Sequence, residues 1–344
     1  MTARRRVNHV QQKLVIRKEL VKVKGNYKII IIRKEDFFKI LKLVKLRILN
    51  KEYEVLMPPI DSFEKNTIDV NGLAVLMSQY MSEVITSSGN TNQTTPAQIA
   101  LSTSNGTITL TYTGNVKLNT QGVSVYWQIF EESNNFVAQY YYVGYDTTDA
   151  SYTTSQIELY ASAISFGRGS GGADVAYYTD IVRIAYANAS FTKTSNSYLF
   201  IVWLIQFQNV PPYALLFIPT LQNNTGIGVN DNRQGSSYAV LVNNNNCTFT
   251  CSGNCSSGGI TGFVTYVQGN SVITEIPVVV VIGTGVSTAE ILICSSVGFS
   301  VPTIGGWQQI FTISTNFQTT LSPPVSGGQF YVALATITII FQTS

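Results

Sequence analysis

After Pro96 the chain is a succession of short runs rich in β-branched and aromatic residues, separated by clusters of Gly, Asn, Ser and Pro. Runs of this kind favour β-strands, and the clusters favour turns. Almost no three- or four-residue hydrophobic period links the runs, so helical crossovers are not expected and the sheets should be mainly antiparallel. The two most apolar runs, 198–207 and 276–282, are too short to cross a membrane as helices and predict strands buried on both faces.

This pattern predicts an all-β protein with two antiparallel β-sandwich domains or one doubled sandwich. The chain of 344 residues is long enough for two sandwiches and a smaller part before them. Apolar residues recur at three- and four-residue spacing over 72–85 and predict one helix, with Asn71 as its cap. The expected organisation is a basic β-rich N-terminal module over 1–60, the helix and a polar linker over 61–96, and sandwiches over 97–210 and 211–344, divided near the Pro211-Pro212 pair.

Charge is distributed unevenly along the chain. Charged residues make up only 12% of it, about half of the usual share, so uncharged polar groups must form most of the surface. Residues 1–65 hold 17 of the 22 Lys and Arg against 7 acidic residues, whereas the remaining residues hold 5 basic and 12 acidic ones. The first segment is therefore expected to attract polyanions, acidic lipid or an acidic protein surface. The second should change little in stability with pH, because few of its groups titrate.

The basic segment is itself expected to fold. Strand-like runs at 14–24 and 27–33 flank Gly25-Asn26 and predict a tight hairpin, and a second hairpin is predicted near Asn50. Between the hairpins, Asp36 could cap a short helical turn. The segment lacks the uninterrupted apolar stretch of a secretory signal, so export by the general route is not expected. The residues expected to anchor the segment to a partner through their charge are Arg4, Arg5, Arg6, Lys13, Arg17, Lys18, Lys22, Lys24 and Lys28.

Residues suited to catalysis are scarce. The sole histidine, His9, lies in the basic segment, so the body has no imidazole for nucleophilic catalysis or for a histidine metal site. Acidic residues could act in pairs, as in glycosidases, but their spacing matches no known motif. We therefore expect no enzymatic activity, no cofactor and no metal.

Four cysteines carry a further expectation. Three of them follow one another with three-residue gaps, which differ from the two-residue spacing typical of zinc knuckles, and the fourth is distant, so two disulfides are favoured over a zinc site. Cytosolic proteins of mesophiles rarely keep disulfides, which indicates an extracellular particle or the cytoplasm of a hyperthermophile. All three pairings remain open among Cys247, Cys251, Cys255 and Cys294.

Two resemblances suggest a function. The segment NGLAVLMSQYMSEVI…PAQIALSTSNGTITLT, 71–111, resembles a helix, loop and strand pattern of phage virion and tail-associated proteins, with Ser102 and Ser104 in place of the usual glycines. The charge-poor body, rich in Tyr, Thr and Asn, resembles the jelly-roll capsid and turret proteins of icosahedral viruses of hyperthermophilic archaea. This second resemblance implies that the sandwiches are jelly-roll-like and that the protein has a structural role in the virion. The C-terminal run, 330–344, is strand-like where a major capsid protein of that group would have a basic helix, which favours a turret or spike.

The preferred interpretation is a virion subunit that assembles in the host cytoplasm. It would contact copies of itself and other virion proteins, and residues 1–60 would meet the shell, acidic lipid or nucleic acid. One alternative is a subunit of a cell-surface filament assembled by strand addition, which would have to be exported. Another is a fibre module that binds a host receptor or glycan through exposed Tyr and Asn.

Overall fold

The protein is described by a computed structural model that covers residues 12–37, 46–48, 51–53, 62–86, 97–113, 116–162, 164–168, 174–178, 180–211, 228–230, 250–251, 255–260, 264–282, 289–303, 306–321 and 331–344. Side chains are described for 18–37, 62–79, 97–113, 116–125, 130–162, 180–211, 264–275 and 338–344.

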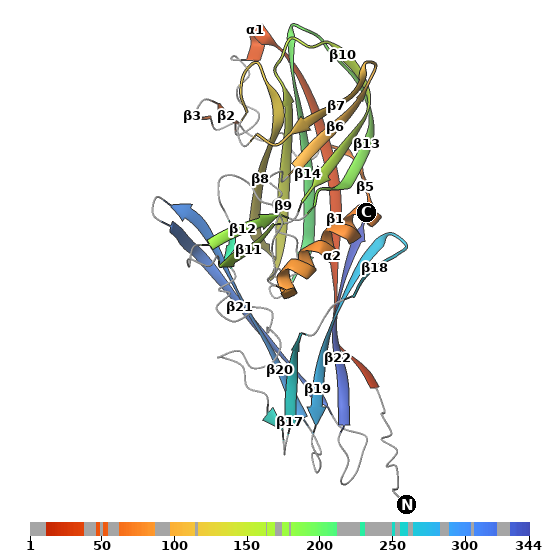
Figure 1. Cartoon of the computed structure of the whole chain (residues 1–344), viewed down its shortest axis with the longest axis vertical. Coiled ribbons are helices and arrows are strands. Elements are labelled where there is room, and N and C mark those ends of the chain that lie inside the picture. Colours follow the sequence, from red (N-terminus) through yellow and green to blue (C-terminus); the bar gives the residue numbers. More distant parts are fainter. Residues whose placement is uncertain are drawn as a thin grey trace, which may run out of the picture.

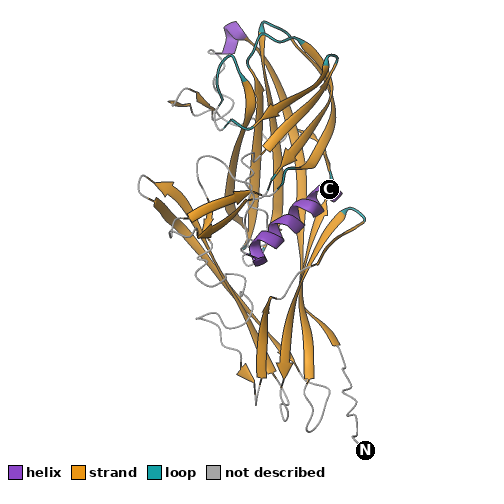
Figure 2. Ribbon diagram, viewed as in Figure 1, coloured by secondary structure: helices purple, strands orange, loops and turns teal. Residues whose placement is uncertain are grey.

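A nine-stranded sheet runs along most of the molecule (Figures 1 and 2). Its main path, in spatial order, is β17 (Cys255–Ile260), β19 (Ser271–Ile282), β22 (Tyr331–Thr343), β1 (Gln12–Arg33), β14 (Ser197–Val210), β9 (Asn135–Asp146) and β8 (Gln121–Glu132). In addition, β18 (Val264–Gln268) pairs with β19, and β4 (Glu64–Lys65) pairs with β1. The pairing of β1 with β22 is parallel, and the other pairings in this sheet are antiparallel.

A second sheet of five strands covers one face of β8, β9 and β14. Its order is β5 (Thr67–Ile68), β13 (Val182–Lys193), β10 (Tyr152–Ala161), β6 (Ala97–Thr103) and β7 (Gly106–Thr111). The two layers approach closely at Gly144, where an added Cβ would lie 2.8 Å from Ile99 Cδ1 of the facing sheet. These two packed sheets, called the sandwich below, meet at the end of the molecule that is uppermost in Figure 1.

The apolar run of β14 lies at the centre of the large sheet. Its residues from Ser197 to Phe207 are all buried, so both faces of the strand are covered, as a continuous apolar run predicts. Aromatic rings extend the core along the sheet: Phe207 makes edge-to-face contacts with Tyr140 and with Phe341 of β22, at centroid distances of 5.8 and 6.1 Å.

The remaining strands form smaller sheets. A hairpin of β11 (Ile164–Arg168) and β12 (Asp174–Tyr178) lies beside a sheet made of β15 (Gly228–Asn230), β16 (Thr250–Cys251), β20 (Ala289–Thr303) and β21 (Gly306–Leu321). β2 (Leu46–Ile48) pairs with β3 (Lys51–Tyr53) and places Arg47 opposite Glu52. This pair confirms the second predicted hairpin of the basic segment.

Two helices complete the described chain. α2 (Val70–Thr86) packs on β13, β18 and β19 through Leu73, Leu76 and Met77. The predicted helix is thus confirmed, but Asn71 is not its cap: Asp69 accepts a hydrogen bond from the Gly72 backbone N–H at 3.1 Å. α1 (Lys34–Phe37) starts before the turn predicted after Asp36, and its Phe37 is buried against Tyr198 and Phe200.

The hairpin predicted at Gly25-Asn26 is wrong, because β1 continues through both residues as one strand. Glycine is needed at position 25 for close packing and not for a turn, because an added Cβ would lie 2.2 Å from Asn66 Oδ1 and 2.6 Å from Ile68 Cδ1. β1 also pairs with β14 on one side and with β22 on the other. Strands assigned by sequence to the basic module and to both sandwiches therefore belong to a single sheet.

The all-β class is confirmed. The two most apolar runs, 198–207 and 276–282, lie in β14 and β19 as predicted.

Candidate functional site

The predicted cations of β1 whose side chains are described lie on one face of that strand. Lys18 and Lys22 are exposed, whereas Lys24 and Lys28 are half-buried, and all four occupy even positions, which point to the same side of the sheet. Lys28 donates a hydrogen bond from Nζ to the Ser62 carbonyl oxygen at 3.0 Å, so it serves the fold. Lys18 and Lys22 are the exposed cations of this row.

The other predicted site residues are described in part or not at all. Arg4, Arg5, Arg6 and Cys247 lie outside the described residues. For the others only the backbone is described: Lys13 and Arg17 in β1, Cys251 in β16, Cys255 in β17 and Cys294 in β20. The cysteine pairing therefore stays a prediction.

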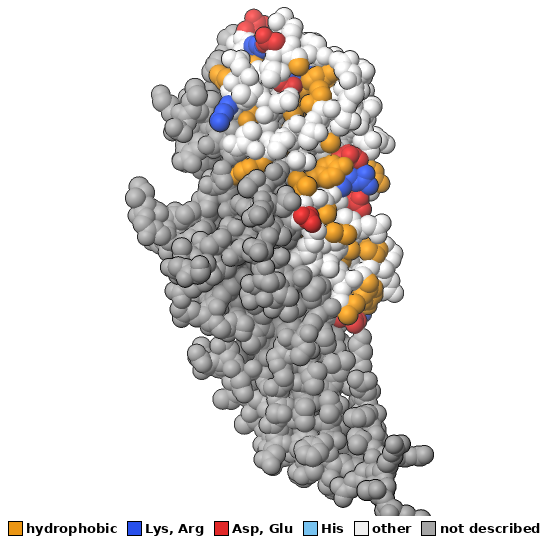
Figure 3. Space-filling model, in the orientation of Figure 1, with side chains coloured by type: hydrophobic (Ala, Val, Ile, Leu, Met, Phe, Trp, Pro, Cys, Tyr) orange, Lys and Arg blue, Asp and Glu red, His pale blue; other side chains and the backbone are white. Residues whose placement is uncertain are grey.

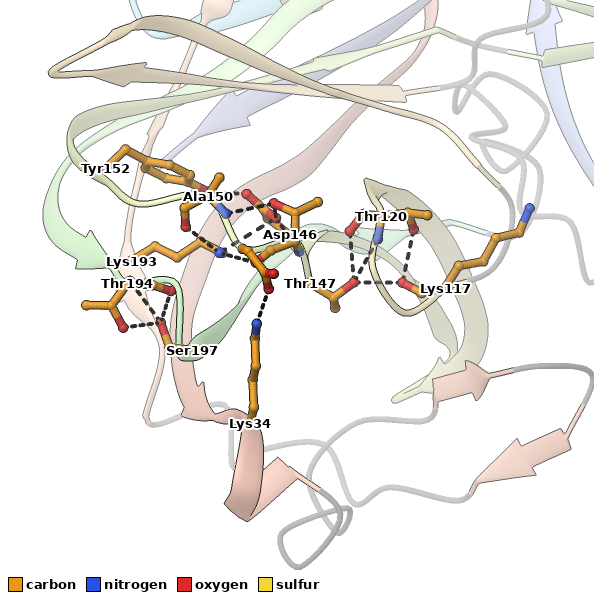
Figure 4. A network of polar contacts seen from close by, with 12 residues as sticks. Lys34, Lys117, Thr120, Asp146, Thr147, Ala150, Tyr152, Lys193, Thr194 and Ser197 are labelled. Carbon is orange, nitrogen blue, oxygen red and sulfur yellow. Dashed lines mark hydrogen bonds and ion pairs between the residues drawn. The ribbon is translucent and has the colours of Figure 1, made fainter.

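A buried ion pair that the sequence analysis missed joins the end of β9 to the end of β13 (Figure 4). Asp146 ends β9, Lys193 ends β13, and both side chains are 0% exposed, with 3.8 Å between Nζ and Oδ1. Burial lowers the pKa of Lys193, and the negative charge of Asp146 opposes this shift.

Hydrogen bonds satisfy both charges of this pair. Lys193 donates from Nζ to the carbonyl oxygens of Thr148 and Ala150, each at 2.8 Å. Asp146 accepts from the N–H and hydroxyl of Thr148, at 2.9 and 2.7 Å, and from the hydroxyl of Tyr152 at 2.9 Å. Burial and the neighbouring carboxylate raise the pKa of Tyr152. The pair thus fixes the loop between β9 and β10 to the end of β13, as expected of a structural ion pair.

Further contacts fasten the loops around this pair. Thr147 is buried and donates from Oγ1 toward the carbonyl oxygens of Lys117 and Thr120, both at 2.9 Å. Lys34 of α1 pairs with Asp149, whose side chain is 82% exposed. The Lys34 ammonium lowers the pKa of Asp149 through a hydrogen bond and its charge.

A second charged cluster joins α2 to the five-stranded sheet. Arg183 of β13 contacts Asp69, the cap of α2, at 2.8 Å and Glu158 of β10 at 2.8 Å. The hydroxyl of Tyr160 donates to the other oxygen of Glu158 at 2.9 Å. The two carboxylates raise the pKa of Arg183, which stays charged. Because one guanidinium bridges both carboxylates, this cluster holds the helix on the sandwich.

The scarcity of basic residues after residue 65 was the signal that could have revealed both clusters. Lys193 and Arg183 are two of only five basic residues after residue 65. In a charge-poor chain, a lone cation inside a strand needs a carboxylate partner if it is buried. The sequence does not say which carboxylate, because both pairings join strands far apart in the chain.

The described surface matches the composition. On the face shown in Figure 3, uncharged groups predominate where side chains are described, with scattered hydrophobic groups and few charges. Within the described residues, no three His, Cys, Asp or Glu side chains are grouped so that they could hold a metal ion. The helices of this described part include none with the length and apolar character needed to cross a membrane.

Comparison with known proteins gives one full-length relative. The chain is 44% identical over 350 residues to "Uncharacterized protein 60" of Sulfolobus islandicus filamentous virus (isolate Iceland/Hveragerdi), and the alignment covers 97% of this chain and 99% of the relative. The chain belongs to the family of this viral protein. No protein-family model matches it, and no solved structure matches it.

Membership of this family confirms the viral origin that the resemblances implied. The relative comes from a filamentous virus, whereas the resemblance concerned icosahedral ones. The match spans nearly the whole of both chains.

Proposed function

We propose that the protein is a structural component of a virus particle, located in the virion and without enzymatic activity. The observation that carries the proposal is full-length kinship with a protein of a filamentous virus, in a chain whose described part is mostly paired β-strand. Particle proteins need a rigid body that associates over large areas, and extended sheets supply both.

The two charged clusters support this proposal. The charges of both clusters form contacts inside the subunit. The buried Asp146–Lys193 pair fixes a loop, and the Arg183 bridge holds the helix. Catalytic acids and bases need access to a substrate, and the atoms of the Asp146–Lys193 pair are not exposed.

The exposed cations of β1 support a docking role for this strand. Lys18 and Lys22 present positive charge beside a body that carries a net negative charge. Partners in this proposal are further copies of the chain and other virion proteins, and the basic strand contacts acidic lipid or nucleic acid. A turret or spike position and a jelly-roll form of the sandwich belong to the same proposal.

Quantitative mass spectrometry of purified virions tests the proposal. The virus that encodes this chain would be purified by density gradient, and its proteins would be compared with those of the infected-cell lysate. We expect the chain to be enriched in the particle fraction at many copies per particle. Abundance in the lysate together with absence from intact particles would contradict a structural role.

A further inference from the structure

The exposed apolar side chains of the described residues gather around one short strand. Seven large hydrophobic side chains are exposed, and three of them, Val264 at 55%, Tyr266 at 40% and Val267 at 39%, lie on the five residues of β18. A fourth, Val75 at 45%, lies on α2, which packs against this strand. In Figure 1, β18 and β19 form a hairpin that projects beside α2.

β18 is also an edge strand. Among the described strands it pairs only with β19, in antiparallel register from Val264↔Glu275 to Gln268↔Ser271, across a turn in which Gly269 has φ of 60°. In a two-residue hairpin the pair next to the turn exchanges both of its hydrogen bonds, and bonded and non-bonded pairs then alternate. The backbone groups of Val264, Tyr266 and Gln268 therefore point to β19, while those of Thr265 and Val267 point outward.

This edge lacks the usual protection against pairing. Exposed edges are normally blunted by charge, by proline or by very short strands. The edge strand β4 consists of Glu64–Lys65, and the outer end of β8 carries Glu131 and Glu132. β18 reads Val-Thr-Tyr-Val-Gln, which has strong β-propensity and no charge.

We propose that β18 pairs with β18 of a second copy of this chain, antiparallel about a two-fold axis at Tyr266. This arrangement places Thr265 of each copy opposite Val267 of the other, and their outward N–H and carbonyl groups form four hydrogen bonds. Tyr266 then faces its own counterpart as a non-bonded pair, in which two aromatic rings pack well. The two nine-stranded sheets become one continuous sheet.

The absence of charge on β18, together with its self-complementary register, favours a second copy of the chain as its partner. A strand that carries lysines would repel its own copy, whereas β18 carries no charge, and its neighbour Glu275 is half-buried with a contact from the Tyr266 hydroxyl at 3.3 Å. Because β18 has only five residues, the contact is smaller than a standard protein interface. The pairing is therefore weak in dilute solution and strengthens when subunits are held together in a particle, so the inference rests on the proposed structural role.

Substitutions at Val267 test the pairing. Proline at this position removes the outward N–H from each copy but leaves the bonds between β18 and β19, since the Val267 N–H does not take part in them. Two of the four intermolecular hydrogen bonds are lost, so Val267→Pro should weaken dimerisation by about tenfold or more in sedimentation equilibrium. Val267→Lys should also weaken dimerisation, because it places a charge on the paired edge and the two lysines become diagonal neighbours that repel each other. Val267→Thr, which keeps the N–H and the β-propensity, should dimerise as the natural chain does.

Cross-linking tests the register. Tyr266→Cys should form a disulfide-linked dimer on oxidation, because non-bonded cross-strand pairs bring Cα atoms to about 4.5 Å. Ile31→Cys, at a position 41% exposed on β1, is the matched control and should give no more linked dimer than the natural chain. Circular dichroism would confirm that each variant is folded.

Two results would overturn the inference. One is a natural chain that stays monomeric at the highest concentration reached, together with no linked dimer from Tyr266→Cys. The other is dimerisation that is equal in Val267→Pro and Val267→Thr. Either could occur while the protein is still found in virions, so this failure is distinct from failure of the proposed function.

Discussion

Replacing Lys193 by Met should destabilise the protein strongly, because the Lys193 side chain is buried and paired with a carboxylate. Methionine has a similar length but cannot donate a hydrogen bond. The change removes the ammonium from beside Asp146 and leaves the carbonyl oxygens of Thr148 and Ala150 without their donor. Asp146 keeps its contacts with Thr148 and Tyr152 but loses its counter-charge.

The size of the effect follows from burial. Removing one partner of a buried ion pair typically costs about 3–5 kcal/mol, and both side chains here are 0% exposed. The surviving hydrogen bonds to Asp146 argue for the lower part of that range, and the orphaned carbonyl oxygens argue for the upper part. We expect the free energy of unfolding, measured by denaturant titration at neutral pH, to fall by about 3–5 kcal/mol.

An exposed pair in the same region gives the control. Lys34 contacts Asp149, whose side chain is 82% exposed, so Lys34→Met should cost less than about 1 kcal/mol. A double variant, Lys193→Met with Asp146→Asn, should lose less than the sum of the two single changes, because the charges interact. Equal losses at Lys193 and Lys34, or strict additivity, would refute the reasoning that the buried pair fixes the loop.

Three further outcomes follow from other contacts. Gly72→Ala should destabilise by about 1–3 kcal/mol although alanine favours helices, because its Cβ would lie 1.6 Å from the Arg183 carbonyl oxygen; a gain in melting temperature would contradict this. Asp69→Ala should cost about 0.5–2 kcal/mol, since α2 loses its cap, and circular dichroism would follow the loss. Burial and Glu64 raise the pKa of Tyr27 to about 12 from 10.0, so its contribution to stability is complete below pH 10.0 and is lost as the pH rises through about 12. Alkaline unfolding of Tyr27→Phe, followed by tyrosine absorbance, should therefore be less steep.

Local patterns predicted the elements of this fold well. The apolar run of β14 indicated a strand buried on both faces, and the three- and four-residue spacing indicated α2, because both signals depend on near neighbours in the chain. Gly25 shows where such reasoning fails. Glycine is typical of turns, but here the absence of a side chain lets Asn66 and Ile68 pack directly on the strand backbone. That contact depends on tertiary structure.

The candidate sites were harder to predict for the same reason. Lys193 lies 47 residues from Asp146 in the numbering, and each ends a different strand. No spacing rule connects the two residues. Charged residues are rare in this part of the chain, however, and that rarity makes both of them candidates for a structural role. The row of Lys18 and Lys22 was predicted from composition, yet the composition did not reveal that their strand joins the two halves of one sheet.

The position of β1 changes what removal of the basic segment should do. An independent anchor could be deleted without harm to the sandwich, but β1 buries Val21, Val23 and Tyr27, each at most 3% exposed. Each such side chain contributes about 1.5–3 kcal/mol, and a whole domain is stable by only about 5–15 kcal/mol. Deleting residues 1–33 also leaves β14 and β22 without their shared partner.

We therefore expect the deleted chain to lack a cooperative unfolding transition, as measured by calorimetry. The variant with both Lys18→Ala and Lys22→Ala separates charge from strand, because these side chains are exposed and their loss should change stability by no more than about 0.5 kcal/mol. If that variant fails to enter virions while remaining folded, the lysines dock the subunit and the strand holds it together. A deleted chain that unfolds cooperatively at the temperature of the full chain would show instead that β1 is dispensable, and the basic segment would then be the separable anchor that the sequence suggested.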